Sequence, residues 1–72
     1  MSKTTTDLKT IIKFGGGISI DGNTKTTSEL QSLAEIAKLN GATIIIRNAG
    51  NKTTTDLKSI ASLAPKQIIF EI

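Results

Sequence analysis

Two loops rich in glycine, lysine and threonine are the first places where this sequence could do chemistry. Residues 21–27 read DGNTKTT and residues 48–55 read NAGNKTTT. Each loop precedes a stretch with helical periodicity, and the free amides and dipole of a helix N-terminus attract anions. The candidates for such an anion site are Lys25, Thr26, Lys52 and Thr53. The alternative interpretation is a turn followed by a threonine helix cap, which requires no ligand. We favour it because neither loop has the GxxxxGK[ST] spacing of a phosphate loop.

The residue types present give little support for acid–base catalysis, nucleophilic catalysis or metal binding. The chain has no histidine and no cysteine, so the commonest general base and the thiolate metal ligands are missing. Its carboxylates are Asp7, Asp21, Glu29, Glu35, Asp56 and Glu71. Three of them stand at expected helix-capping positions, and no nucleophile has an evident base beside it. We therefore expect a protein that is not an enzyme, with no catalytic, cofactor-binding or metal-binding residues.

Composition limits the remaining function classes. A chain of 72 residues is near the lower size limit for one stable hydrophobic core, so it needs well-formed packing or self-association. The net charge of +3 is spread along the chain, which suits solubility better than a phosphate-binding face. With two aromatic residues, the chain lacks the stacking platforms of most single-strand nucleic-acid binders. No segment is long and apolar enough to span a membrane, and we expect a cytoplasmic location.

A threonine-led pattern recurs three times and indicates an internal repeat. Residues 4–15 read TTTDLKTIIKFG, residues 26–37 read TTSELQSLAEIA, and residues 53–64 read TTTDLKSIASLA. The pattern predicts one domain made of units at about residues 4–22, 26–48 and 53–72.

Each repeat begins with the signature of a capped amphipathic helix. A threonine cap followed three residues later by an acidic residue is the capping-box spacing, as in Thr26 and Glu29. Apolar residues then recur with a helical period and predict a core-facing stripe. In the first unit this stripe is Leu8, Ile11, Ile12 and Phe14, and in the second it is Leu30, Leu33, Ala34, Ile36 and Ala37. In the third it is Leu57, Ile60, Ala61, Leu63 and Ala64.

A helix stop and a strand follow each predicted helix. The stops are the glycines at 15–17, Asn40-Gly41 and Pro65. Three glycines could also cradle a phosphate, but here they follow a helix and precede a strand, the reverse of the nucleotide-binding order. The strands are residues 18–20, 42–47 and 67–72, rich in β-branched side chains. The alternation predicts an α/β fold: three helix–strand repeats forming a two-layer, mainly parallel three-stranded sheet with the helices on one face.

Alternation within the strands assigns two faces to the sheet. The helix-facing side chains are expected to be Ile18, Ile20, Ile44, Ile46, Ile68, Phe70 and Ile72. The open face would carry Ser19, Asp21, Thr43, Ile45, Arg47, Gln67, Ile69 and Glu71.

The repeated helix–strand unit resembles leucine-rich-repeat and related α/β solenoids. Residues 18–23, ISIDGN, look like the LxLxxN core of that family, although Ala49 stands at the asparagine position of the second unit. The resemblance implies a protein-interaction scaffold. Two segments, DLKTI at 7–11 and DLKSI at 56–60, are nearly identical. They indicate either a recent internal duplication or an engineered, consensus-like repeat without a biological function.

The open face and the edges of the sheet are where we expect an interface. The candidate residues are Ile45, Ile69, Arg47, Glu71, Phe70 and Ile72. Bare sheet edges recruit partners, and a small domain gains from burying exposed isoleucines. Arg47 could pair with Glu71 across neighbouring strands. We therefore expect a non-enzymatic interaction or structural module that forms homo-oligomers or binds a protein, rather than a monomer with tolerated surface isoleucines. The rival is a weak nucleic-acid or phosphate-ligand binder that uses the two loop lysines.

Overall fold

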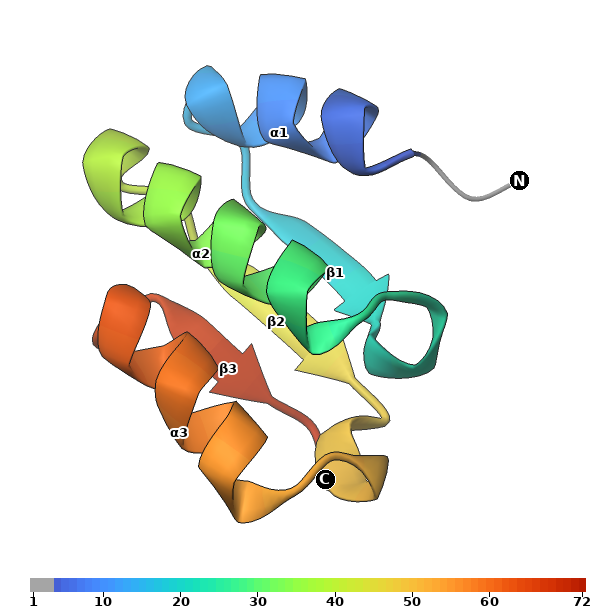
Figure 1. Cartoon of the computed structure of the whole chain (residues 1–72). Helices are drawn as coiled ribbons and strands as arrows, with labels where there is room; N and C mark the ends of the chain where they lie inside the picture. The colour runs from blue at the N-terminus through green and yellow to red at the C-terminus, as the bar shows by residue number, and fades with distance from the viewer. Residues whose placement is uncertain (1–3) are drawn as a thin grey trace.

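The computed structural model describes residues 4–72, in which helices and strands alternate along the chain. The order is α1 (Thr5–Lys13), β1 (Ile18–Asp21), η1 (Gly22–Thr24), α2 (Thr27–Asn40), β2 (Ile44–Arg47), η2 (Ala49–Asn51), α3 (Thr54–Leu63) and β3 (Ile68–Phe70). The elements η1 and η2 are single turns of 3-10 helix. Figure 1 shows the helices side by side in chain order, in front of the strands.

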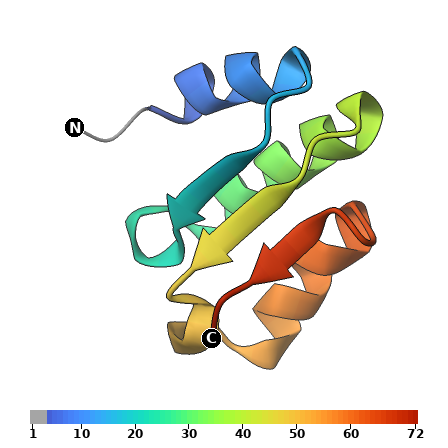
Figure 2. The ribbon, with the colours of Figure 1, turned by 180° about the vertical axis from the view of Figure 1, so that it is seen from behind.

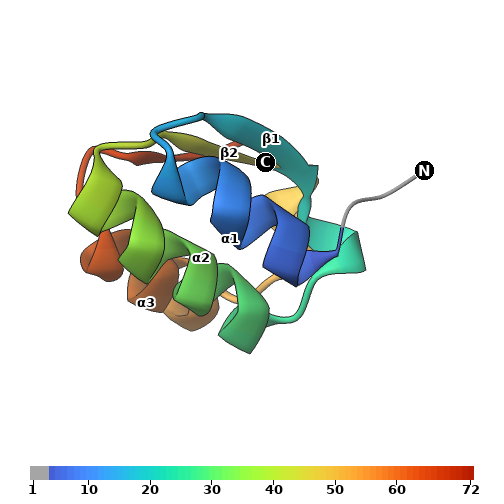
Figure 3. The ribbon, with the colours of Figure 1, turned by 90° about the horizontal axis from the view of Figure 1, so that it is seen from above.

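The strands of this described part form one parallel sheet in the order β1-β2-β3. The register places Ile18, Ile44 and Ile68 next to one another across the three strands. The helices cover one face of the sheet and leave the other open, as the view from behind and the view from above show (Figures 2 and 3). The prediction of a two-layer α/β fold is confirmed.

The predicted strand limits need correction. The first strand extends one residue further than predicted, to Asp21, whereas the second begins at Ile44 rather than at residue 42. The third spans Ile68–Phe70 instead of residues 67–72. The ends of a strand are set by the backbone hydrogen bonds it makes to its neighbours, and these cannot be read from the alternation of side chains.

Threonine hydroxyls start all three helices of the described residues, as predicted. Thr4, Thr26 and Thr53 are the N-caps, and each hydroxyl accepts a hydrogen bond from the backbone N–H three residues later, at 3.1–3.2 Å. In α2 the carboxylate of Glu29 also accepts from the backbone N–H of Thr26 at 3.0 Å. The full capping box is therefore formed at α2. This helix has 14 residues, against 9 in α1 and 10 in α3.

One continuous hydrophobic core lies between the helices and the sheet. Its largest fully buried side chains are Ile12, Leu30, Leu33, Ile44, Ile46 and Ile60. Apart from α1, the helical stripes are buried or half-buried as predicted.

The stripe assigned to α1 was partly wrong. Leu8 and Ile12 are buried, but Ile11 is 39% exposed and Phe14 is 87% exposed. The equivalent residues Ile36 and Leu63 are half-buried, so the exposure of Phe14 follows from the lack of a neighbouring helix on that side of α1 within residues 4–72. Phe14 is also the residue that caps the C-terminal end of α1, beyond the last helical turn.

Gln67 departs from its predicted place on the open face. Its side-chain amide is half-buried and donates to two backbone carbonyls, those of Ala37 at 2.7 Å and Ala42 at 2.8 Å. The carbonyl of Ala37, in the last turn of α2, also accepts from the backbone N–H groups of Gly41 and Ala42. Gly41 ends this helix in the left-handed conformation, with φ of 69°. Gln67 thereby ties the entry of β3 to the connection between α2 and β2.

Among the helices of residues 4–72, none combines the length and the apolar character needed to cross a membrane.

Candidate functional site

The open face of the sheet carries a short apolar row. The register aligns Ser19, Ile45 and Ile69 across the three strands. Ile45 is half-buried and Ile69 is 48% exposed, although no helix covers this face (Figure 2). The two predicted interface isoleucines therefore lie next to each other on adjacent strands and form the apolar part of this surface.

A charged row follows at the carboxyl ends of β1 and β2. Asp21 on β1 is aligned with Arg47 on β2. The pKa of Asp21 lies below its usual value, mainly because its carboxylate accepts a hydrogen bond from the backbone N–H of Asn23, at 2.9 Å. The amide of Asn48 and the charge of Arg47 lower this pKa further. Within residues 4–72, Arg47 makes no ion pair with Glu71, so the charge facing Arg47 across the sheet is that of Asp21.

The C-terminal segment continues pairing beyond β3 and ends on the surface. The backbone N–H of Glu71 donates to the carbonyl of Ile46, and the Glu71 carbonyl accepts from Ala49, both at 2.9 Å. Phe70 is half-buried against the core. Ile72 was expected to face the helices but is 89% exposed. Ile72 lies beyond the end of β3, next to Gly50 of η2, where α3 no longer covers the sheet. Because it is outside the strand, strand alternation does not predict its exposure.

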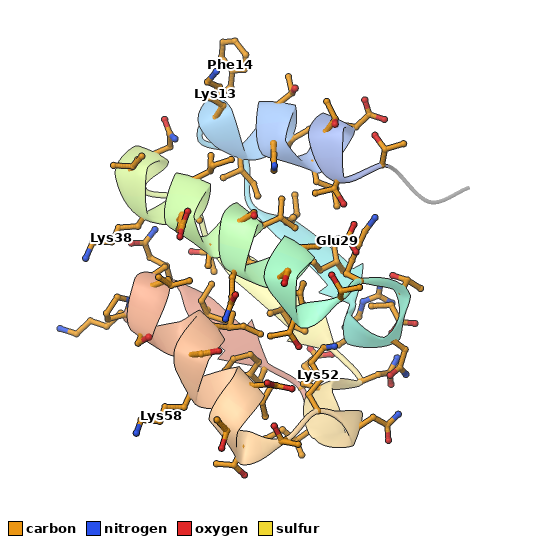
Figure 4. The ribbon with its side chains drawn as sticks, viewed as in Figure 1. Lys13, Phe14, Glu29, Lys38, Lys52 and Lys58 are labelled. Atoms are coloured by element: carbon orange, nitrogen blue, oxygen red, sulfur yellow. The ribbon has the colours of Figure 1, made fainter. Side chains whose placement is uncertain are left out.

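The four candidate anion-site residues gather where the strands lead into α2 and α3. The ammonium group of Lys52 donates to the backbone carbonyl of Lys25, with 3.2 Å between nitrogen and oxygen (Figure 4). The hydroxyls of Thr26 and Thr53 accept from the first turns of α2 and α3. The side chains of Lys52, Thr26 and Thr53 thus hold the two loops and the helix starts together.

The N-terminus of α2 already holds an anion of the chain itself. The Glu29 carboxylate accepts from the backbone N–H of Thr26 at 3.0 Å and from the hydroxyl of Thr5 at 2.7 Å. These bonds, with the nearby charge of Lys25, lower the pKa of Glu29 to about 2. A carboxylate that is ionised at neutral pH occupies the position a bound phosphate would need. At α2, the geometry therefore favours the capping interpretation over an external ligand.

The asparagine of the leucine-rich-repeat-like segment is on the surface. Asn23 is exposed in η1, and its side-chain oxygen accepts from the side-chain amide of Asn51 in η2, at 3.2 Å. Asn48, with φ of 56°, is an extra residue between β2 and η2 and shifts the second loop by one position. Consequently Gly22 and Ala49 are the buried first residues of the two turns.

The candidate interface overlooked two apolar residues on the first unit and one on the second. Phe14 and Ile11 are exposed on α1, and Leu39 is 84% exposed in the last turn of α2. Figure 4 shows Phe14 projecting from the end of α1, away from α2. The repeat alignment contained the signal for α1, because Phe14 matches Ile36 and Leu63, and the first helix has no earlier helix beside it.

Among residues 4–72, no three side chains of a metal-binding type come together. Comparisons with protein-family models, with curated proteins and with solved structures found no significant match for the chain.

Proposed function

We propose that this protein is a non-enzymatic repeat module that acts by associating with other copies of itself. The observation that carries the proposal is the open face of the sheet, where Ile69 is 48% exposed beside the half-buried Ile45. Ile72, at the C-terminal end beside Gly50, adds a further exposed isoleucine. Contiguous apolar patches of more than a few hundred Å² on the surface of a protein commonly mark interaction sites, and a row of exposed isoleucines is the start of such a patch.

The size of the chain supports the same proposal. An interface of standard size buries about 800 Å² on each partner. The accessible surface is 4420 Å², so one such contact would cover roughly a fifth of it. A domain this small, without disulfides, gains much of its stability from each additional buried face.

A relation to leucine-rich-repeat scaffolds is the finer form of this proposal. Its support is architectural: helix–strand units follow one another with the strands in chain order in one parallel sheet. The surface position of Asn23 sets the chain apart from the LxLxxN pattern. We therefore propose the interaction role of such scaffolds without their asparagine arrangement.

Sedimentation velocity across a wide concentration range tests the proposal. We expect the weight-average mass to rise with concentration and the thermal unfolding midpoint to rise with it, because association stabilises only the folded state. A strict monomer at high concentration would contradict it.

Titration with short single- and double-stranded DNA and RNA at low salt tests the alternative function, that of a weak nucleic-acid binder. We expect no saturable binding, since the chain's positive charges are dispersed. Affinity that falls steeply with added salt would favour the rival.

A further inference from the structure

Each helix of the repeat has two flanks, and the hydrogen bonds between helices define them. Across α1 and α2, the hydroxyl of Thr5 donates to the carboxylate of Glu29 at 2.7 Å. Across α2 and α3, the side-chain amide of Gln31 donates to the hydroxyl of Ser59 at 2.9 Å. Thr5 and Gln31 thus point toward the following helix, on the downstream flank. Glu29 and Ser59 point toward the preceding helix, on the upstream flank.

The repeat alignment and the helical period extend these flanks to equivalent positions. The upstream flank comprises Asp7, Thr10, Ile11 and Phe14 in α1; Glu29, Ser32, Leu33 and Ile36 in α2; and Asp56, Ser59, Ile60 and Leu63 in α3. The downstream flank comprises Thr5, Lys9 and Ile12 in α1; Thr27, Gln31 and Ala34 in α2; and Thr54, Lys58 and Ala61 in α3.

The upstream flank is covered in α2 and α3 but bare in α1. All four positions are buried or half-buried in α2 and again in α3, whereas all four are exposed in α1. The clearest case is Ile11, which is 39% exposed while its equivalents Leu33 and Ile60 are fully buried. The first unit therefore presents to solvent the surface that the second and third units bury against a neighbouring unit.

On the downstream flank, burial falls from the first unit to the third. Its three positions are buried or half-buried in α1 and in α2. In α3, Thr54 and Lys58 are exposed and Ala61 is only half-buried, while its equivalent Ala34 is fully buried. The third unit therefore presents the complementary surface, the one that receives a following unit.

The sheet repeats this contrast between the middle and the ends. On the helix-facing side, Ile44 and Ile46 of the central strand are almost fully buried. Ile18 on β1 and Ile68 and Phe70 on β3 are only half-buried, while Ile20 on β1 is buried at 7% exposure. The outer edges of β1 and β3 each have no neighbouring strand within the described residues.

We propose that copies of this chain stack head to tail, with α3 and β3 of one copy against α1 and β1 of the next. The second copy would continue the repeat as a fourth unit, with its β1 parallel to β3. This inference rests on the self-association proposed above and locates the contact at the two ends of the repeat instead of at the open face.

The two end surfaces are complementary in shape and in hydrogen-bonding groups. Inside the chain, the small residue Ala34 is on the flank that faces the flank carrying Ile60 and Leu63. At the junction, Ala61 would take the role of Ala34, opposite Ile11 and Phe14 of the next copy. Lys58 on the downstream flank would approach Thr10 on the upstream flank, as Gln31 approaches Ser59. Thr54 would donate to Asp7 as Thr5 donates to Glu29.

Such a contact joins two different surfaces and so leaves a free end on each side. Head-to-tail contacts give rings when the rotation closes and open chains when it does not. A face-to-face contact through Ile45 and Ile69 would instead use the same surface on both copies and stop at a dimer. Assembly size therefore distinguishes the two geometries.

The test uses one variant blocked at each end. Phe14→Lys blocks the upstream flank of α1, and Ala61→Arg blocks the downstream flank of α3. We expect each variant alone to be a monomer at concentrations where the unmodified chain associates, with the apparent dissociation constant raised at least tenfold. We expect an equimolar mixture to form a one-to-one dimer that does not grow, because one intact end of each kind remains. Glu35→Lys, an exposed change on α2 outside both flanks, is the matched control and should assemble like the unmodified chain. Ile69→Lys tests the alternative contact through the open face.

Other outcomes separate the inference from the proposed function. If Ile69→Lys abolishes association while both end variants still associate, the head-to-tail inference fails and self-association stands. If the unmodified chain never associates, both fail. Circular dichroism checks that each variant is folded, and Thr54→Asp, which would face Asp7, replaces Ala61→Arg if the arginine variant does not fold. In that case the double variant Asp7→Lys, Thr54→Asp should restore association, and a failure to restore it would contradict the junction.

Discussion

The middle unit and the first unit carry nearly the same sequence pattern but lie in different surroundings. In α2 both flanks are covered, so that Leu33 and Ala34 are fully buried. In α1 the downstream flank is covered and the upstream flank is in solvent, which exposes Phe14. The comparison shows that the pattern encodes two packing surfaces per unit, and that neighbours decide which of them is used.

The largest expected effect comes from truncating the same side chain at equivalent positions. Ile60→Ala should lower the free energy of unfolding by about 2–5 kcal/mol, because it leaves a cavity in the core. Ile11→Ala, at the exposed counterpart, should cost no more than about 1 kcal/mol. Urea denaturation at low protein concentration measures both, and Ile60→Val, expected to cost about 0.5–1.5 kcal/mol, substitutes if the alanine variant does not fold. Equal losses at the two positions would show that the flanks are not distinct.

A smaller effect is expected at the connection between α2 and β3. Gln67→Ala should cost about 1–3 kcal/mol, because the carbonyls of Ala37 and Ala42 lose their side-chain donor in a half-buried place. Gln31→Ala removes one bond, to Ser59, and serves as the matched control with an expected cost of about 1 kcal/mol. Both are measured by urea denaturation, and a larger loss for Gln31→Ala would contradict the role assigned to Gln67.

The smallest expected effect is the acid dependence of the α1–α2 contact. The pKa of Glu29 falls from 4.5 to about 2 on folding, so its ionised form is favoured in the folded state. Its contribution to stability is therefore complete above about pH 5 and is lost as the pH falls toward 2. Glu29→Gln should lower stability at pH 6, and its difference from the unmodified chain should shrink on acidification.

Thermal unfolding between pH 6 and pH 2 gives this comparison. Glu35→Gln, an exposed change of equal charge on the same helix, is the control. A stability gap between the unmodified chain and Glu29→Gln that is independent of pH would show that the carboxylate's charge has no part in holding α1 to α2.

Local signals in the sequence were sufficient for the helices and for the order of the elements. The cap threonines, the stripes of α2 and α3 and the stop at Gly41 follow from short-range spacing, and the structure confirms them. The exposure of Phe14 and Ile72 could not be obtained from pattern alone, since both depend on how far a neighbouring element reaches. The inward turn of Gln67 depends on the carbonyls of Ala37 and Ala42, which come together only once α2 and β2 are in place.

The candidate site was predicted less completely than the fold. Ile45 and Ile69 were correctly placed together on the open face, because strand alternation and register decide this. The bare flank of α1 was missed, because it is recognised only by comparing the same position in three units. Ile11 and Phe14 are equivalent to residues that α2 and α3 bury against a neighbouring helix, and this equivalence identifies them as part of a packing surface.

Hydrogen exchange at low and high protein concentration tests the central claim most directly. At low concentration, we expect the amides of Ile44–Arg47 in the central strand to be the most protected in the sheet. At high concentration, the outward amides of Ile18–Asp21 and Ile68–Phe70 should gain protection together, because a β1 and a β3 from neighbouring copies pair. Association that leaves both edge strands as exchangeable as in the dilute protein would contradict the continuation of the repeat from one copy into the next.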